Sequence, residues 1–492
     1  MSAERMNEAL VVELTPAPEP IDACARFADL PGCLLLESMV RSERLGRYSF
    51  LSADPFLVLR SKGPVVEEVS ASGVRRVEAD PFTALQRALA RYRTDTLPGL
   101  PPFQGGAAGY FGYELGQHLE TLPQAPYDDL ALPDLCVGFY DWVLAWDHAS
   151  GRAWLVSNGL PAAGAERRAR AQARADFVRA RLEATSSPGE PMEEPAAPAP
   201  VRERPPTWPV PGIAGVASTF SRDAYLAAVA RAREYILAGD IFQVNLSQRL
   251  QAPYAASPFA LYRAVQRRNP APFAAYFRTP DATIVSASPE RFLRVVEGRV
   301  ETRPIKGTAP RGINPMHDMA LARALRESEK DRAENVMIVD LLRNDLSRVC
   351  DDHSVEVPEL CIVESYATVH HLVSTVVGRL RPGHDAVDVL RAAFPGGSIT
   401  GAPKVRAMEI IAEIEPTSRG PYTGAIGYIG FDGTMDTNIA IRTFIVQADT
   451  AYFQVGGGIV ADSEPEKEYL ETLAKAQGLL AALEVPSGAA DR

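Results

Sequence analysis

Short runs of apolar and β-branched residues recur along the first third of the chain. Runs of this length, separated by turn-forming residues, are typical of strands. They predict strands at residues 33–37, 48–53, 58–60, 107–110, 138–145 and 153–157. The Ala/Arg-rich segment 163–184 follows them, and its charged residues cover most of a helix circumference. This segment therefore predicts a surface helix.

Helical and strand-like segments alternate from about residue 219 onward. Ser221 is a typical N-cap for a helix over 222–238, and Gly239 is a typical C-cap. Strand-like runs lie at residues 284–288, 292–297 and 299–303, with a hairpin turn at 297–298, and long helices are predicted over 320–347 and 464–482. Several strands follow one another without an intervening helix, so antiparallel sheets are favoured over a doubly wound fold.

Prolines concentrate between these two regions. Nine of the 40 prolines in the 492-residue chain lie between Pro188 and Pro211. Such a stretch sustains neither a helix nor a central strand, so we expect an exposed linker. The predicted organisation is an N-terminal region at 8–185, a Pro-rich linker at 186–215 and a C-terminal region at 216–483.

Charge and cysteine content narrow the class of protein. The 62 acidic and 51 basic side chains give a net charge of −11, which argues weakly against a general nucleic-acid binder. No apolar run reaches about 18 residues, so we expect no membrane span. The five cysteines form no CxxC pair, and the first residues lack a signal-peptide layout. A cytoplasmic protein without structural zinc is expected.

Two predicted helices carry carboxylates at helical spacing. Such spacing places them on one stripe of each helix. The stripes consist of Glu327, Asp331 and Glu334 in one helix, and of Glu464, Glu468, Glu471 and Lys475 in the other. If both stripes faced one point, their oxygens would suit Mg²⁺. A pair of solvated acidic faces is the alternative, and composition alone favours it.

A segment between these helices predicts a strand over 438–446 with Arg442 in its middle. A mid-strand arginine requires an anionic partner, which is equally well a ligand carboxylate or a structural Asp or Glu. The Gly456–Gly458 triplet offers bare backbone amides to an anion, or is simply a turn. His370 and His371 would point to opposite faces of a strand, so they cannot clamp one metal ion.

Lys306 and Glu290 each follow a predicted strand. A nucleophilic lysine must be neutral, which requires burial or cationic neighbours. From this segment alone, an exposed lysine at a strand end is the better interpretation. Glu290 is a candidate general acid or base.

Taken together, these motifs resemble the chorismate-utilising enzyme family. The matching stretches are GDIFQVNLSQR (239–249), SPERF (288–292), RPIKGTAPRG (303–312), AENVMIVDLLRNDLSRV (333–349), HLVSTV (371–376), PGGSITGAPKVRAMEII (395–411), GPYTGAIGYIG (420–430), MDTNIAIRT (435–443) and GGGIVADSEPEKEYLETLAKA (456–476). They cover almost all of the C-terminal region in order. The resemblance implies an α+β fold, with two packed antiparallel sheets flanked by helices, and a Mg²⁺-dependent reaction on chorismate.

The resemblance also assigns expected roles. The expected magnesium ligands and their supporting carboxylates are Glu334, Glu471, Glu468 and Asp331. The groups expected to hold a substrate carboxylate are Arg442, Tyr422 and the backbone of Gly458. The residues expected to line the ring and magnesium side are His371, Ser398 and Thr400. Lys475 matches a lysine of the last helix, and Glu290 matches the acid that assists loss of the C4 hydroxyl.

Particular positions indicate the branch of the family. Members that add water carry a lysine base where this chain has Gln243, which speaks against them. The anthranilate branch reads PIAGT where this chain reads PIKGT, and PIKGT resembles the branch that makes 4-amino-4-deoxychorismate for para-aminobenzoate and folate. The resemblance then implies that Lys306 attacks C2 of chorismate as a covalent catalyst. Anthranilate formation is the alternative.

The N-terminal region resembles the subgroup that works with a glutamine amidotransferase. Its signals are LLLES (34–38), GRYSFL (46–51) and PFQGGAAGYFGYE (102–114). No cysteine lies in a GxCxG elbow, so we expect a separate amidotransferase subunit to supply ammonia. The residues that match a tryptophan pocket are Glu37, Ser38, Arg47, Tyr48, Ser49, Pro270 and Pro272. Bound tryptophan and simple packing are equally favoured there.

A non-catalytic module that only holds an amidotransferase is a further alternative. The presence of a full set of candidate catalytic groups argues against it, because a scaffold needs none of them. That set is Glu290, Lys306, Glu334, Arg442 and Glu471.

Overall fold

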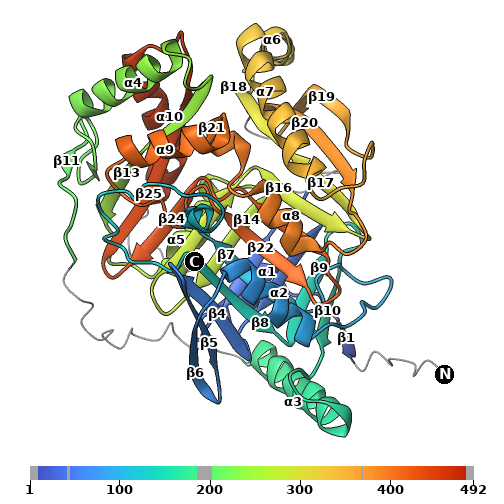
Figure 1. Ribbon diagram of the computed structural model, residues 1–492. Coiled ribbons are helices and arrows are strands. Elements are labelled where there is room, and N and C mark those ends of the chain that lie inside the picture. The colour runs from blue at the N-terminus through green and yellow to red at the C-terminus, as the bar shows by residue number, and fades with distance from the viewer. Residues whose placement is uncertain (1–8, 41–44, 185–201, 367–368, 484–492) are drawn as a thin grey trace.

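A computed structural model describes residues 9–40, 45–184, 202–366 and 369–483. Two large antiparallel sheets form the body of the molecule, and helices flank them (Figure 1). The predicted α+β class with two antiparallel sheets is confirmed. Most of the predicted linker, residues 186–201, lies outside the described residues. No helix within the described ranges is long and apolar enough to cross a membrane.

The first sheet combines strands from both ends of the chain. Its order is β1 (Leu10–Leu14), β10 (Arg152–Ser157), β9 (Trp142–Asp147), β3 (Tyr48–Ser52), β2 (Leu34–Glu37), β14 (Phe273–Arg278), β15 (Thr283–Ser288), β24 (Thr443–Gln447), β25 (Thr450–Ile459), β13 (Gln243–Pro253), β12 (Ala217–Ser218) and β11 (Trp208–Pro209), with β21 (Gly401–Ala402) also paired to β13.

The second sheet combines the same two regions. Its order is β18 (Ile305–Pro310), β20 (Val369–Arg379), β17 (Arg299–Arg303), β16 (Arg291–Val296), β23 (Met435–Asn438), β22 (Ala425–Gly430), β7 (Gly106–Phe111), β8 (Leu135–Tyr140), β4 (Leu57–Lys62), β5 (Val65–Ser70) and β6 (Gly73–Glu78), with β19 (Glu356–Ser365) also paired to β20. N-terminal and C-terminal strands therefore share both sheets.

Helices pack against the sheets from outside. They are α1 (Pro20–Ala25), α2 (Pro81–Arg91), α3 (Gly164–Glu183), α4 (Arg222–Leu237), α5 (Pro258–Arg268), α6 (Pro315–Glu327), α7 (Glu329–Ser347), α8 (Ala386–Ala393), α9 (Lys404–Ile414) and α10 (Pro465–Leu483), with 3₁₀ turns η1 (Tyr113–His118) and η2 (Gly397–Ile399). α10 lies on β25, and α7 lies on β18 and β20. Ser221 caps α4 as predicted, since its hydroxyl accepts the Ala224 N–H.

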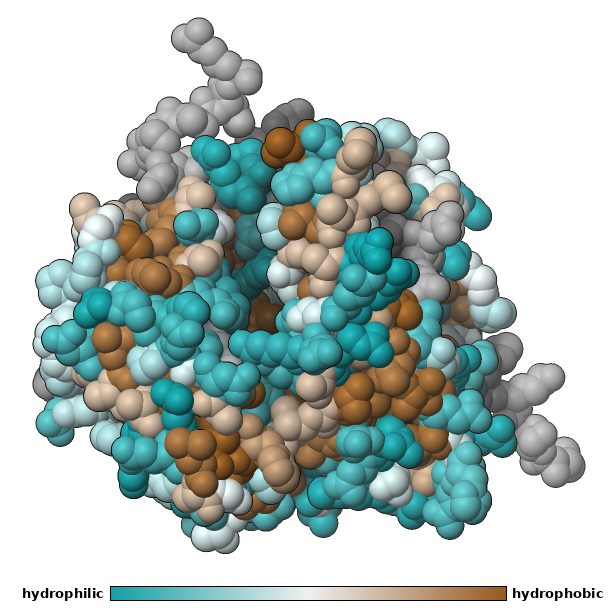
Figure 2. Space-filling model, turned by 90° about the horizontal axis from the view of Figure 1, so that it is seen from above, coloured by the Kyte–Doolittle hydropathy of each residue, from teal (hydrophilic) through white to brown (hydrophobic). Residues whose placement is uncertain are grey.

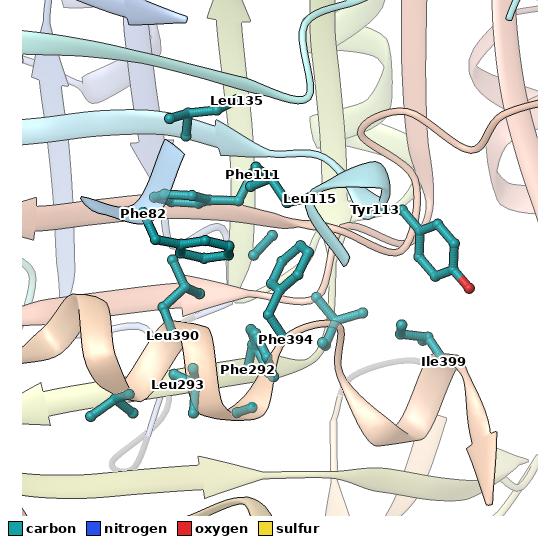
Figure 3. Close-up of a cluster of buried hydrophobic side chains, with 14 of the residues drawn as sticks. Phe82, Phe111, Tyr113, Leu115, Leu135, Phe292, Leu293, Leu390, Phe394 and Ile399 are labelled. Carbon is teal, nitrogen blue, oxygen red and sulfur yellow. The ribbon is translucent and has the colours of Figure 1, made fainter. Parts of the chain in front are cut away.

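Apolar side chains fill the space between the sheets and beneath the helices. One cluster joins the facing sides of the two sheets, with Leu34 and Ile284 from the first and Tyr110 and Ile426 from the second. Another cluster joins α2, α8 and the second sheet (Figure 3). Burial of this kind, at about 25 cal/mol per Å² of apolar surface, is the main term that favours folding.

Two predicted elements are interrupted in the structure. The predicted strand 138–145 is β8 followed by β9, which belong to different sheets, and buried Asp141 separates them. Asp141 forms ion pairs with Arg170 and Arg174 of α3. The predicted helix 320–347 is α6 followed by α7, with Ser328 between them. Ser328 Oγ accepts the backbone N–H of Asp331, so a new helix begins there.

Candidate active site

The candidate site lies between α7 on one side and α10 on the other. These helices stand on opposite sides of a gap at the top of Figure 1. Seen from above, this face of the molecule is hollowed near its centre, and hydrophilic residues surround much of the hollow (Figure 2). The predicted site residues come from both sheets and from the helices that flank the gap.

Glu290 lies in the turn between β15 and β16 and is buried, with 4% of its surface exposed. Ser398 Oγ donates a hydrogen bond to Glu290 Oε1 at 2.7 Å. Burial raises the pKa of Glu290 to about 7, although the Ser398 hydrogen bond and the charge of Lys306 oppose the rise. A carboxyl with this pKa can donate a proton near neutral pH.

Lys306 points into the site from β18. Its Nζ donates a hydrogen bond to the carbonyl oxygen of Ser398 at 2.9 Å. Burial lowers the pKa of Lys306, while the carboxylates of Glu334 and Glu290 oppose the change. The interpretation of Lys306 as an exposed strand-end lysine is therefore wrong, because the flanking acid groups and the Ser398 segment enclose it.

Arg442 lies between two strands, not within one. β23 ends at Asn438 and β24 begins at Thr443, and Arg442 has the left-handed backbone conformation (φ 51°). The predicted strand 438–446 is wrong because this conformation interrupts the strand. Among the residues that the structure describes, no carboxylate forms an ion pair with Arg442, and burial alone lowers its pKa. An unpaired, largely buried guanidinium suits a ligand carboxylate.

The two neighbouring histidines of β20 face opposite sides, as predicted. His371 Nδ1 lies 2.9 Å from Thr308 Oγ1. Burial, together with the charge of Arg442, lowers the pKa of His371 to about 4, so its ring is neutral at neutral pH. His370 Nε2 instead lies 3.0 Å from the Asp318 carboxylate. His371 therefore belongs to the site and His370 does not.

Three of the predicted carboxylates flank the gap, with Glu334 on α7 and with Glu468 and Glu471 on α10. Burial raises the pKa values of Glu334 on α7 and Glu468 on α10, and the charge of Glu471 raises both further. Glu468 Oε2 and Glu471 Oε1 lie 3.4 and 3.6 Å from the position of a Cβ at Gly457. Mutually repelling carboxylates beside a bare glycine fit a hard divalent cation. Within the described ranges no three His, Cys, Asp or Glu side chains already surround one point, so the Mg²⁺ site stays a prediction.

Glu327 is not part of this acidic group. It ends α6, is exposed and pairs with Arg323 at 2.8 Å, so the predicted stripe through Glu327 is wrong. Asp331 lies in the first turn of α7, against β18, because its Cγ is 2.9 Å from the Cβ position of Gly307.

Lys475 links α10 to β25. Its Nζ is 2.7 Å from Glu471 Oε1 and donates to the carbonyl oxygen of Gly456 at 3.0 Å. Although burial opposes the change, Lys475 lowers the pKa of Glu471 and keeps this carboxylate ionised.

Gln243 is buried with an unsatisfied side-chain amide. It is 1% exposed, and within the described part of the chain neither amide atom has a hydrogen-bond partner. A Cβ at Gly458 would lie 2.0 Å from Gln243 Nε2, so any larger residue there would force the Gln243 amide to move. An unsatisfied buried polar group costs roughly 1–3 kcal/mol, which suits a group held ready for a ligand.

Two further predicted site residues, Tyr422 and Thr400, have buried side chains. Tyr422 is buried, its pKa is raised to about 12 by burial, and the Arg419 guanidinium lies 5.8 Å from its ring centroid. Thr400 Oγ1 donates to the carbonyl oxygen of Gly396 at 3.0 Å. The Thr400 hydroxyl therefore stabilises its own loop.

A buried ion pair beneath the site was not predicted from the sequence. Arg419 and Glu415 are 2.6 Å apart, and their side chains are 1% and 4% exposed. Arg419 also donates to the carbonyl oxygens of Ile399 and Asn245. Opposite charges at i, i+4 were the available signal, but this spacing is common on helix surfaces.

A separate cavity of about 200 Å³ contains most of the predicted tryptophan pocket. Glu37, Ser38, Arg47, Tyr48 and Pro272 line it. Further lining residues were not predicted from the sequence, and they include Arg291, Arg294, Tyr428, Asp436 and Asn438.

Two residues predicted for this pocket do not line the cavity. Ser49 is fully buried behind it and accepts the backbone N–H of Ser38 at 3.1 Å. Pro270 is exposed just before β14. Their assignment to a tryptophan pocket stays a prediction, because motif matching does not tell a wall residue from the residue that supports it.

The sequence profile of the chorismate binding enzyme family matches residues 47–481. The chain belongs to this family and is a chorismate-utilising enzyme.

Relatives from two branches resemble the chain over almost its whole length. Aminodeoxychorismate synthase component 1 of Salmonella typhimurium is 42% identical over 461 residues, covering 92% of this chain and 94% of that protein. Anthranilate synthase component 1 of Pseudomonas aeruginosa is 41% identical over 471 residues, covering 94% and 92%. The crystal structure of anthranilate synthase component I from Streptococcus pneumoniae matches with a TM-score of 0.76 at 33% identity, covering 88% of this chain and 92% of that one.

Proposed function

We propose that this chain is an aminodeoxychorismate synthase component I, which converts chorismate and ammonia to 4-amino-4-deoxychorismate for para-aminobenzoate and folate synthesis. Overall identity does not separate this activity from anthranilate synthesis, since relatives of both kinds lie near 42%. The observation that carries the proposal is Lys306, whose amine is hydrogen-bonded to the Ser398 carbonyl beside Glu290 and has a pKa lowered by burial.

The proposed reaction proceeds by two displacements. Neutral Lys306 Nζ attacks C2 of chorismate, the double bonds shift, and the C4 hydroxyl leaves as water with a proton from Glu290. Ammonia then attacks C4, the double bonds shift back, and the C2–Nζ bond breaks. Ammonia enters and water leaves, so atoms balance. The proton that Lys306 loses on forming the bond returns when it is expelled, and the proton that ammonia loses after attacking C4 restores the Glu290 carboxyl.

Substrate and metal binding are assigned to the charged and polar groups that flank the gap. Arg442 would bind one carboxylate of chorismate, with neutral His371 beside it. Glu334, Glu468 and Glu471 would hold Mg²⁺, which would neutralise carboxylate charge and orient the ring. Lys475 keeps Glu471 ionised and able to bind a cation.

Ammonia would come from a second subunit in the cytoplasm. The relatives are named as component 1, which supports a partner component. We propose that the partner is a glutamine amidotransferase and that free ammonium replaces it poorly.

Product analysis tests the proposal. Purified protein is given chorismate, Mg²⁺ and ammonium, and products are separated by chromatography, with a chelated arm that lacks Mg²⁺. We expect 4-amino-4-deoxychorismate, and none after chelation. Lys306→Ala should lower C4 amination by about 100-fold or more, the effect of losing a positioned catalytic group. Lys467→Ala, an exposed lysine on α10, is the matched control. A wild-type rate in Lys306→Ala would exclude the covalent role.

Anthranilate synthesis is the second candidate, and the cavity near β2 and β3 favours it. Its lining matches the tryptophan pocket expected from the anthranilate branch. Fluorescent anthranilate that accumulates without an added lyase would select this candidate. Titration calorimetry with tryptophan, paired with an activity assay, would tell a regulatory site from a structural one.

A further inference from the structure

A short loop between α8 and α9 positions both proposed catalytic groups. Residues 394–403, here called the Ser398 loop, supply the hydroxyl that bonds Glu290 and the carbonyl that binds Lys306. The loop lies directly on α7, since a Cβ at Gly397 would be 2.5 Å from Leu341 Cδ2. Phe394, at the start of the loop, and Ile399, within it, lie among the buried apolar residues (Figure 3).

One lysine ties both ends of this loop to α7. Lys404 is the first residue of α9, directly after the loop. Its Nζ donates to Asp345 Oδ2 on α7 at 2.6 Å and to the carbonyl oxygen of Ala393, the last residue of α8, at 2.9 Å. The same α7 carries Glu334 of the predicted metal site. A single ammonium group therefore joins three helices around the site.

Stability does not explain this ion pair. The side chains of Lys404 and Asp345 are 14% and 1% exposed. Burial lowers the pKa of Lys404 and raises that of Asp345, and Asp345 Oδ1 has no hydrogen-bond partner among the described residues. Replacing such a pair with apolar residues of similar size often leaves stability unchanged or increased.

We propose that Lys404 and Asp345 are positioning residues, which hold the Ser398 loop in register with α7 so that Glu290 and Lys306 meet the substrate correctly. The inference rests on the roles proposed above for these two groups. Neither positioning residue touches the reacting atoms.

The test separates stability from catalysis in one double variant, Lys404→Met with Asp345→Val. We expect a melting temperature equal to or above that of the wild type. The kcat for chorismate consumption should fall by about 10- to 100-fold, because misplacement of a catalytic group by about 1 Å has an effect of this size. KM should change less, since Arg442 and Gln243 are untouched.

A second readout reports on Glu290 without catalysis. Its carboxyl infrared band, assigned by its loss in Glu290→Gln, gives the pKa directly. Ser398 Oγ lowers this pKa, and Lys306 is the charged group that faces Glu290. A displaced loop weakens the hydrogen bond, so the pKa of Glu290 should rise in the double variant.

Matched variants keep the proposal falsifiable. Arg174→Met breaks a buried pair with Asp141 under α3, remote from the site, and should lower the melting temperature while kcat stays unchanged below it. If the double variant fails to fold, Asp345→Asn keeps the shape and should show a smaller kcat loss with the same direction of pKa shift. Folded variants with wild-type kcat and an unchanged Glu290 pKa would overturn the proposal.

The identity of the product is measured separately. Accumulation of anthranilate would exclude the proposed function. The Lys404 test measures chorismate consumption and the Glu290 carboxyl band, and neither depends on which product forms. The two proposals can therefore fail independently.

Discussion

At the residue scale, the site is built from groups that the protein leaves incompletely satisfied. Arg442 has no ion-pair partner among the described residues, and the amide of Gln243 makes no hydrogen bond there. Glu290 has its pKa raised toward neutrality by burial, and burial lowers that of Lys306. Each arrangement opposes folding, which is typical of groups that serve a binding or catalytic site.

Arg442 and Arg291 should respond differently to the same substitution. Arg442→Met removes an unpaired charge, so we expect an unchanged or higher melting temperature and a KM for chorismate raised by at least about tenfold. Arg291→Met leaves Asp436 and Glu301 unpaired and should lower stability by about 3 kcal/mol. Thermal melts and steady-state kinetics check both. A stability loss in Arg442→Met would mean that the arginine is structural.

Glu290 should titrate near neutral pH in the free enzyme. Its folded pKa of about 7 lies above the ordinary value, so the protonated fraction falls as pH rises through 7. Ser398→Ala removes a hydrogen bond that favours the charged form, so the protonated form should persist to higher pH. Infrared titration of the carboxyl band measures this. An unshifted band in Ser398→Ala would show that Ser398 does not influence Glu290.

At the element scale, the sequence predicts most strands but not their interruptions. β3, β10 and β17 agree with their predicted ranges within a residue, because apolar runs bounded by turn residues report strands well. The breaks at Asp141, Ser328 and Arg442 were missed. Each depends on the capping bond, ion pair or backbone conformation of one residue, and apolar periodicity does not record it.

The residues of the site were also predicted from the sequence, but their surroundings were not. Motif resemblance named Glu290, Lys306 and Arg442, but it could not show that Lys306 is enclosed or that Arg442 lacks a partner. Resemblance also did not indicate that Ser49 and Thr400 bond to the backbone of neighbouring segments. The local signal for the α6–α7 break was present, since Ser328 and Asp331 have the spacing of a helix start.

The break between α6 and α7 gives an element-scale prediction. Ser328→Ala removes the hydroxyl that caps α7 and should lower the free energy of unfolding by about 1 kcal/mol. Ser347→Ala, at the other end of α7, should change it by less than about 0.5 kcal/mol. Urea denaturation followed by circular dichroism compares the two. Equal effects would mean that the Ser328 cap does not stabilise the helix.

At the scale of the whole molecule, the N-terminal and C-terminal regions share both sheets. β2 pairs with β14, and β7 pairs with β22, so neither region completes a sheet alone. We expect fragments 1–184 and 202–492, expressed separately, to lack cooperative melting transitions. The intact chain should unfold in one transition by calorimetry. A fragment that melts cooperatively on its own would show that its region is an independent domain.

The pairing of β7 with β22 also constrains how the protein is made. Gly106 lies opposite Gly430, about 320 residues later in the chain. At about 5–20 residues per second, a ribosome needs roughly 15–60 s to deliver the partner strand. During that interval β7 can pair with β8 but not with β22, so one edge of this apolar strand has no partner. Because unpaired apolar edges promote aggregation, we expect the nascent chain to need chaperone protection until β22 has been made.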